Sequence, residues 1–161
     1  MKKTLIALCM LFVAFNVQAQ EADAAEEQAI AMELAAIDLG MKVDTELFQQ
    51  MSTNMYVSQS PKAMAMGLIV PETYENAKGK LETNLPPEFK ISKKEEITIN
   101  GVVAMFVEGT IQSPEGVINC VVYCTKRDAD TSIMFMGMTE VGIDKKYEAA
   151  INDAVNSLIK K

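Results

Sequence analysis

The chain has 161 residues, with 15 basic and 22 acidic side chains, a formal net charge of −7, and neither histidine nor tryptophan. The acidic balance disfavours binding to nucleic acid and to anionic lipid headgroups. The lack of histidine removes the commonest general base and the commonest transition-metal side-chain ligand.

The first segment, 1–19, has the features of a cleaved secretory signal peptide. Lys2 and Lys3 precede an apolar run at 5–15, and the sequence VQA then ends at Ala19, where a signal peptidase would cut. The apolar run is shorter than the roughly 20 residues that cross a bilayer, so a retained anchor is the less favoured interpretation. We therefore expect an exported protein, periplasmic or secreted, with no transmembrane segment after signal removal.

The mature chain divides into an acidic, Ala-rich segment at 20–42 and a domain at 43–161, which we expect to be a single α/β sandwich. The stretch EADAAEEQ at 21–28 has no apolar residue that could anchor it, so a frayed or disordered beginning is expected. A helix is predicted over 29–40 because apolar residues recur there at helical spacing, namely Ile30, Leu34, Ile37 and Met41.

The next elements are predicted from changes in apolar period. Residues 43–51 are predicted to form a short helix or turn, with Asp44 as its cap. Residues 54–70 predict two strands about a turn at 60–62. Residues 71–85 then change to a helical period and end before a pair of prolines.

From Phe89 onward the sequence predicts an antiparallel meander of four strands. EFKIS is a candidate edge strand, and EEITI meets VVAMFVEGTIQ across Asn100–Gly101, a strong short hairpin signal. That strand meets VINCVVYCTK across the turn SPEG, and TSIMFMGMTEV follows. A final helix is predicted at 144–159, with Asp144 as its N-cap.

The middle strands indicate how the sheet is covered. VVAMFV, INCVVYC and IMFMGM are apolar at both alternating sets of positions, whereas a sheet with one wet face alternates apolar and polar residues. Both faces are therefore expected to be covered, by the helices at 71–85 and 144–159 and with 29–40 as a further candidate. The predicted fold class is α+β, a mainly antiparallel sheet in a three-layer α/β/α sandwich.

The strand AMGLIV is followed by the helix PETYENAKGKLETNL, the hairpin ITINGVVAMFVEGTI, the strands VINCVVYCT and SIMFMGM, and a last helix ending NSLIKK. This order of features, from about Tyr56 to Leu158, resembles the Mog1/PsbP/DcrB-like family of small α/β proteins, and most of all its bacterial envelope members. The resemblance implies an antiparallel sheet flanked by helices and a binding or accessory role without assigned catalysis. It carries no family site over to individual residues of this chain.

Cys120 and Cys124 are the only cysteines after the predicted signal cleavage. In a regular strand, positions four apart point to the same face with their Cα atoms roughly 13 Å apart, whereas a disulfide needs roughly 4.4–6.8 Å. We expect two buried thiols, with an intermolecular bridge or a bulge that permits pairing as the alternatives.

Methionines form the second candidate site. Met134, Met136 and Met138 are predicted to share one face of a strand, and Met64 with Met66 repeats the pattern. Thioethers are soft ligands for Cu(I), so this methionine stripe is a candidate metal site. The competing interpretation is core filling by flexible apolar side chains, which the apolar neighbours favour.

Catalytic motifs are missing from the sequence. It has no G-x-S-x-G, no H-E-x-x-H and no phosphate-binding glycine loop, and its serines have no histidine to activate them. We expect no enzyme and no cofactor, but an envelope protein that acts as a binding or accessory module for a protein or a small apolar ligand. A Cu(I)-handling protein is the alternative, and an enzyme that uses carboxylates alone ranks third.

Overall fold

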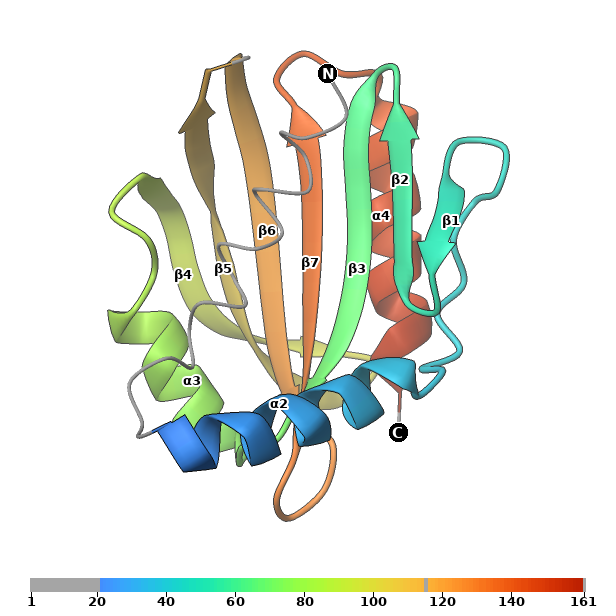
Figure 1. Cartoon of the computed structure of the whole chain (residues 1–161). Helices are drawn as coiled ribbons and strands as arrows, with labels where there is room; N and C mark the ends of the chain where they lie inside the picture. Colours follow the sequence, from blue (N-terminus) through green and yellow to red (C-terminus); the bar gives the residue numbers. More distant parts are fainter. Residues whose placement is uncertain (1–20, 115, 161) are drawn as a thin grey trace.

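The computed structural model describes residues 21–114 and 116–160, so the signal peptide predicted at 1–19 lies outside the described residues. Within the described residues, three helices and seven strands follow one another (Figure 1): α2 (Glu21–Ala36), β1 (Gln49–Ser52), β2 (Met55–Gln59), β3 (Lys62–Val70), α3 (Tyr74–Thr83), β4 (Phe89–Ile99), β5 (Val102–Ser113), β6 (Gly116–Lys126), β7 (Ser132–Glu140) and α4 (Lys145–Leu158).

The strands form one sheet in the order β1-β2-β3-β7-β6-β5-β4, and every neighbouring pair is antiparallel. The predicted meander is confirmed as β4–β5–β6–β7, and the two predicted strands of 54–70 are confirmed as β2 and β3. β3 pairs with β7, which joins the first hairpin to the end of the meander. The α+β class with an antiparallel sheet is thus confirmed.

The hairpin between β4 and β5 turns where the sequence predicts. Asn100 and Gly101 both have positive φ, 51° and 78°, which the tight two-residue turn of a hairpin requires. The side-chain amide of Asn100 also donates hydrogen bonds of 2.9 Å to the carbonyls of Asn156 and Ile159. The turn is therefore fixed to the C-terminal end of α4.

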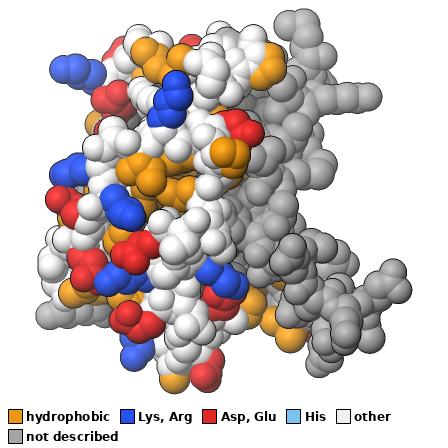
Figure 2. All heavy atoms as spheres, turned by 90° about the vertical axis from the view of Figure 1, so that its left-hand side faces the viewer, with side chains coloured by type: hydrophobic (Ala, Val, Ile, Leu, Met, Phe, Trp, Pro, Cys, Tyr) orange, Lys and Arg blue, Asp and Glu red, His pale blue; other side chains and the backbone are white. Residues whose placement is uncertain are grey.

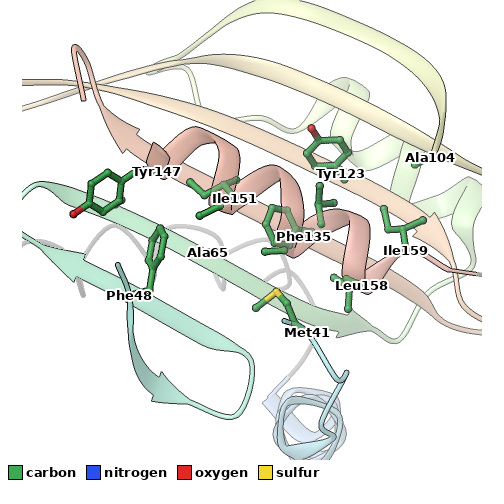
Figure 3. Close-up of a cluster of buried hydrophobic side chains, with 14 of the residues drawn as sticks. Met41, Phe48, Ala65, Ala104, Tyr123, Phe135, Tyr147, Ile151, Leu158 and Ile159 are labelled. Atoms are coloured by element: carbon green, nitrogen blue, oxygen red, sulfur yellow. The ribbon is translucent and has the colours of Figure 1, made fainter. Parts of the chain in front are cut away.

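Alternate residues of the central strands enter two separate apolar clusters. The first, called here the α4-side cluster, contains Ala65 of β3 and Phe135 of β7 together with Ile151 of α4 (Figure 3). The second, the α3-side cluster, contains Met64 and Met136 from the same two strands. This division explains why the central strands are apolar at both alternating sets of positions.

Helix α4 approaches the sheet closely at one glycine. A Cβ atom on Gly137 of β7 would clash with Cγ2 of Ile151 and would lie 2.9 Å from Cγ2 of Val121. Asp144 is the N-cap of α4, as predicted, and its Oδ1 accepts a 3.0 Å hydrogen bond from the backbone nitrogen of Lys146. Glycine is thus required where the helix packs on β7.

The N-terminal predictions need correction. The structure has a regular helix from Glu21, where a frayed beginning was expected, and this helix ends at Ala36, before Gly40. The predicted stripe is buried only in part, because Ile30 is 42% and Ile37 37% exposed, whereas Met41, beyond the end of the helix, is buried. Ala and Glu favour helix through their backbone propensity, without any need for a buried stripe.

The segment 43–51 also differs in part. A turn at 45–47 is present, and Oδ1 of Asp44 accepts a 2.9 Å hydrogen bond from the nitrogen of Glu46. The following residues form the short strand β1, which pairs with β2. Pairing with a partner strand, and not the local apolar period, decides the structure of these residues.

The two candidate strands EFKIS and EEITI are a single edge strand, β4, with an irregularity in its pairing to β5 between Ile91 and Lys93. Among the three described helices, none is long and apolar enough to cross a membrane.

Candidate ligand-binding cavity

A cavity of about 340 Å³ lies between α2, β3 and α3. Its walls are mostly apolar: Ala31 and Ala35 come from α2, Met66 and Leu68 from β3, and Ala77 and Leu81 from α3. In Figure 1, α2 crosses one end of the sheet. The cavity volume falls at the low end of the range of roughly 300–1,000 Å³ that is typical of small-molecule sites.

Three methionines from three strands line this cavity: Met55 of β2, Met66 of β3 and Met134 of β7. Met55 is the register partner of Met66, and Met134 pairs with Leu68, two residues along β3 from Met66. Diagonal neighbours of this kind lie roughly 7–8 Å apart at most between Cβ atoms, within reach of long side chains. Methionine is flexible and polarizable, so these walls can adapt to an apolar occupant.

The structure divides the predicted methionine stripe. Met136 and Met138 are buried in the α3-side cluster, with exposed fractions of 1% and 5%. Met134 is only partly buried and lines the cavity, where it joins two methionines from other strands. The prediction that Met134, Met136 and Met138 hold a metal ion stays a prediction.

Cys120 and Cys124 are free thiols in a β6 strand of regular register, and both side chains are buried. The expectation of two buried thiols with no bridge between them is therefore confirmed. Burial raises the pKa of each thiol to about 12, and the negative charge of Glu72 adds to the rise for Cys124. Protonated buried thiols are poor nucleophiles and poor metal ligands, so this pair contributes packing.

One ion pair lies on the cavity wall. Glu72, in the turn after β3, and Lys80 of α3 both line the cavity, and Nζ of Lys80 donates a hydrogen bond to Oε1 of Glu72. The other carboxylate oxygen, Oε2, is buried and has no hydrogen-bond partner among the described residues. The cavity therefore combines apolar walls with one incompletely satisfied acceptor.

Backbone contacts fix the position of Glu72. The hydroxyl of Ser132, at the start of β7, donates a 2.8 Å hydrogen bond to the carbonyl of Glu72. The nitrogen of Glu72 donates a 2.8 Å hydrogen bond to the carbonyl of Val70. Ser132 is itself fully buried, so the turn that carries Glu72 is held against the sheet.

The buried Asn54 attaches the C-terminal end of α2 next to the cavity, which Asn54 also lines. Its Oδ1 accepts a 3.0 Å hydrogen bond from the nitrogen of Leu39, and its Nδ2 donates one of 2.7 Å to the carbonyl of Ile37. These two bonds position the helix that supplies Ala31 and Ala35 to the wall.

The outer surface beside α3 has a different character. Figure 2 shows side chains of both charges on this side of the molecule, with smaller apolar areas between them. Lys78 of α3 pairs with Glu96 of β4 at 2.9 Å, and Lys93 pairs with Glu95 at 2.7 Å within β4. Exposed pairs of this kind contribute little to stability, and they give the surface mixed charge.

No protein-family model and no curated protein matches this chain. Solved structures do match. PA94 from Pseudomonas aeruginosa, a protein of unknown function, has a TM-score of 0.50 and 17% identity over 62% of this chain and 74% of that one. LpqN of Mycobacterium tuberculosis, described as involved in cell envelope biogenesis, has a TM-score of 0.50 and 12% identity over 73% of this chain and 78% of that one. At these identities the likeness shows a shared fold, the Mog1/PsbP-like fold that the sequence pattern resembles.

Proposed function

We propose that the protein is a non-catalytic binding protein of the cell envelope that holds a small apolar ligand in the cavity between α2, β3 and α3. The observation that carries the proposal is the cavity itself, whose walls are apolar and rich in methionine. The lack of histidine and of catalytic motifs favours binding over catalysis.

The size of the cavity limits the ligand. At roughly 30 Å³ for each water-sized group, a volume of about 340 Å³ holds about eleven non-hydrogen atoms. A single chain of about ten carbons is therefore of a size to occupy this space. Ligands of this size reach dissociation constants on the order of 10–100 µM.

Export and a role in the envelope rest on the signal-like segment at 1–19 and on the fold shared with LpqN, whose own description concerns cell envelope biogenesis. We further infer that the helices cover both faces of the sheet in a three-layer α/β/α arrangement. The support for this is that residues of α4 belong to one apolar cluster and residues of α3 to the other.

Calorimetric titration of the protein with 1-decanol tests the proposal. Wild type should bind with a dissociation constant on the order of 10–100 µM. Ala35 lines the cavity, whereas the neighbouring Ala36 does not. Ala35→Leu should therefore weaken binding at least tenfold because the larger side chain fills the cavity, and the matched control Ala36→Leu should bind like wild type. No binding to wild type, or equal binding to both variants, contradicts the proposal.

Cu(I) binding is the second candidate function, and the observation that favours it is that Met55, Met66 and Met134 line one cavity. Anaerobic titration with Cu(I) against a weak chelator tests it. Met66→Leu and Met134→Leu should lower the affinity, whereas Met51→Leu, at an exposed position of β1, should not. Affinity no tighter than that of the competing chelator ends this candidate.

A further inference from the structure

Helix α2 forms one wall of the cavity and has few buried contacts with the rest of the fold. It supplies Ala31 and Ala35 to the lining. Of the side chains described at 29–36, none belongs to the α4-side cluster or the α3-side cluster, and only Leu34 is half-buried. By comparison, α4 buries six of its residues. A helix with so few buried apolar contacts opens locally at a small cost in free energy.

The chain is held firmly just beyond the end of this helix. Asn54 accepts a hydrogen bond from the nitrogen of Leu39 and donates one to the carbonyl of Ile37. The nitrogen of Lys42 donates a 2.8 Å hydrogen bond to Oγ of Ser157 in α4. The fixed segment therefore begins at the residue that follows α2, and any motion of α2 pivots at the C-terminal end of the helix.

We propose that α2 is a lid of the cavity, which detaches from β3 to admit the ligand and closes over it once the ligand is bound. This inference rests on the proposed function and adds the route of ligand entry to it. A detached helix of 16 residues is close to the length at which isolated helices are only marginally stable in water, so detachment and unwinding go together. A ligand in the cavity adds apolar contact to Ala31 and Ala35, and it thereby favours the closed lid.

Amide hydrogen exchange of the mature protein, with and without 1-decanol, tests the lid. Because the open lid does not hold the ligand, 1-decanol at ten times its dissociation constant should slow the exchange of α2 about elevenfold. The matched control is the set of β4 amides whose exchange rate does not depend on low concentrations of urea, since these amides exchange by local opening. Their rates should stay unchanged, because β4 supplies no residue to the described lining of the cavity. If α2 also keeps its rate, its opening does not release the ligand and the inference is overturned.

Two substitutions at Met32 change the stability of the lid without touching the ligand. Met32 is 75% exposed in α2 and is not among the described residues that line the cavity. Met32→Gly lowers the helix propensity by an amount that corresponds to about fivefold in the opening equilibrium, so the exchange of α2 and the rate of ligand release should both rise about fivefold. The dissociation constant should change less than about twofold, because the closed lid still predominates. Met32→Ala removes the same side chain but keeps a good helix former, and it should behave like wild type.

The outcomes separate the inference from the proposed function. Line shapes of ¹³C-labelled methionine methyl groups in the cavity give the release rate, and calorimetric titration gives the dissociation constant. If wild type does not bind 1-decanol, the proposed function is wrong and the inference with it. If wild type binds but Met32→Gly releases the ligand at the wild-type rate, the ligand enters by another route and only the inference is overturned. Equally accelerated release in both Met32 variants overturns it too, because the loss of the side chain and not the opening of the helix would then set the rate.

Discussion

The side-chain amide of Asn54 donates a 2.7 Å hydrogen bond to the carbonyl of Ile37, just beyond the last turn of α2. Its oxygen accepts a second hydrogen bond, 3.0 Å long, from the nitrogen of Leu39. Asn54 is 5% exposed, whereas the side chains at 29–36 of α2 are mostly in contact with solvent. One buried side chain therefore supplies specific polar contacts that hold α2 next to the cavity.

Replacement of this side chain should loosen α2. Asn54→Ala removes two partly buried hydrogen bonds and leaves two backbone groups without partners, which costs about 2–3 kcal/mol of unfolding free energy. Amide hydrogen exchange should become faster in α2. The rates in β5 and β6 should remain unchanged once they are corrected for the loss of global unfolding free energy. Urea unfolding and hydrogen exchange together measure both effects.

Asn152→Ala is the matched control for this change, because Asn152 is an exposed asparagine in the middle of α4. It should change the unfolding free energy by less than about 0.5 kcal/mol. Equal losses for the two alanine variants, or unchanged exchange of α2 in Asn54→Ala, would show that Asn54 does not hold the helix.

The close contact of α4 with β7 gives a second prediction. Gly137→Ala places a methyl group against Ile151 and Val121 in a packed interior, so it should lower the unfolding free energy by about 1–3 kcal/mol. The midpoint of urea unfolding measures the change. In a double variant with Ile151→Ala the contact with Ile151 is removed and only that with Val121 remains, so the two single losses should not add.

Gly79 provides a control of opposite sign. It lies in the middle of α3, and a Cβ atom there meets nothing within 4 Å. Gly79→Ala should therefore raise stability by about 0.5–1 kcal/mol, since alanine is the better helix former. A destabilised Gly79→Ala, or a neutral Gly137→Ala, contradicts the packing described for the respective helix.

The buried thiols predict a loss of stability at high pH. Burial raises the pKa of Cys120 and Cys124 from 9.0 to about 12 in the folded protein. Below pH 9 both states hold these protons, and the stabilisation is fully present. Between pH 9 and pH 12 the unfolded thiols ionise while the folded ones stay protonated, so stability falls as pH rises, by about 1.4 kcal/mol per pH unit for each thiol.

The double variant Cys120→Ala/Cys124→Ala isolates this effect from the titration of tyrosine. Between pH 9 and pH 11, wild type should lose stability more steeply than the variant, by about 3 kcal/mol per pH unit. Urea unfolding at each pH gives the two slopes. Parallel slopes would mean that the thiols ionise as readily in the folded state as in the unfolded one.

The meander was predictable because its signals are local. Asn100–Gly101 supplies the positive φ values of the turn, and the two-sided apolar pattern of the central strands reflects one cluster on each face. The helix α4 carries both its cap and a buried stripe, which includes Tyr147 and Ile151. Each of these features can be read from a few neighbouring residues.

β1 and α2 were predicted less well because contacts distant in sequence decide them. β1 exists through its pairing with β2, and α2 is held at one end by Asn54, which lies 17 residues from Ile37 in the chain. The apolar spacing at 29–40 suggested a buried face, but Ile30 and Ile37 are exposed. Local pattern cannot show which partner a marginal element will find.

The cavity could not be predicted at all. It combines alanines of α2 with methionines of three strands and with Glu72 from a turn, and no two of these elements share a motif. Sequence spacing correctly places Met134, Met136 and Met138 on one face, but only the arrangement of the helices decides which of them is buried. The one signal that could have drawn attention to Glu72 is its position beside Pro71, between a strand and a helix.

The most direct test of the cavity is the spectrum of the protein with ¹³C-labelled methionine methyl groups, recorded while 1-decanol is added. Met55, Met66 and Met134 line the cavity, whereas Met105 is buried in β5 outside it. The resonances of the three cavity methionines should shift together and saturate with one dissociation constant, and that of Met105 should stay in place. Unchanged cavity resonances at saturating alcohol, or shifts spread evenly over the methionines, would contradict a ligand site between α2, β3 and α3.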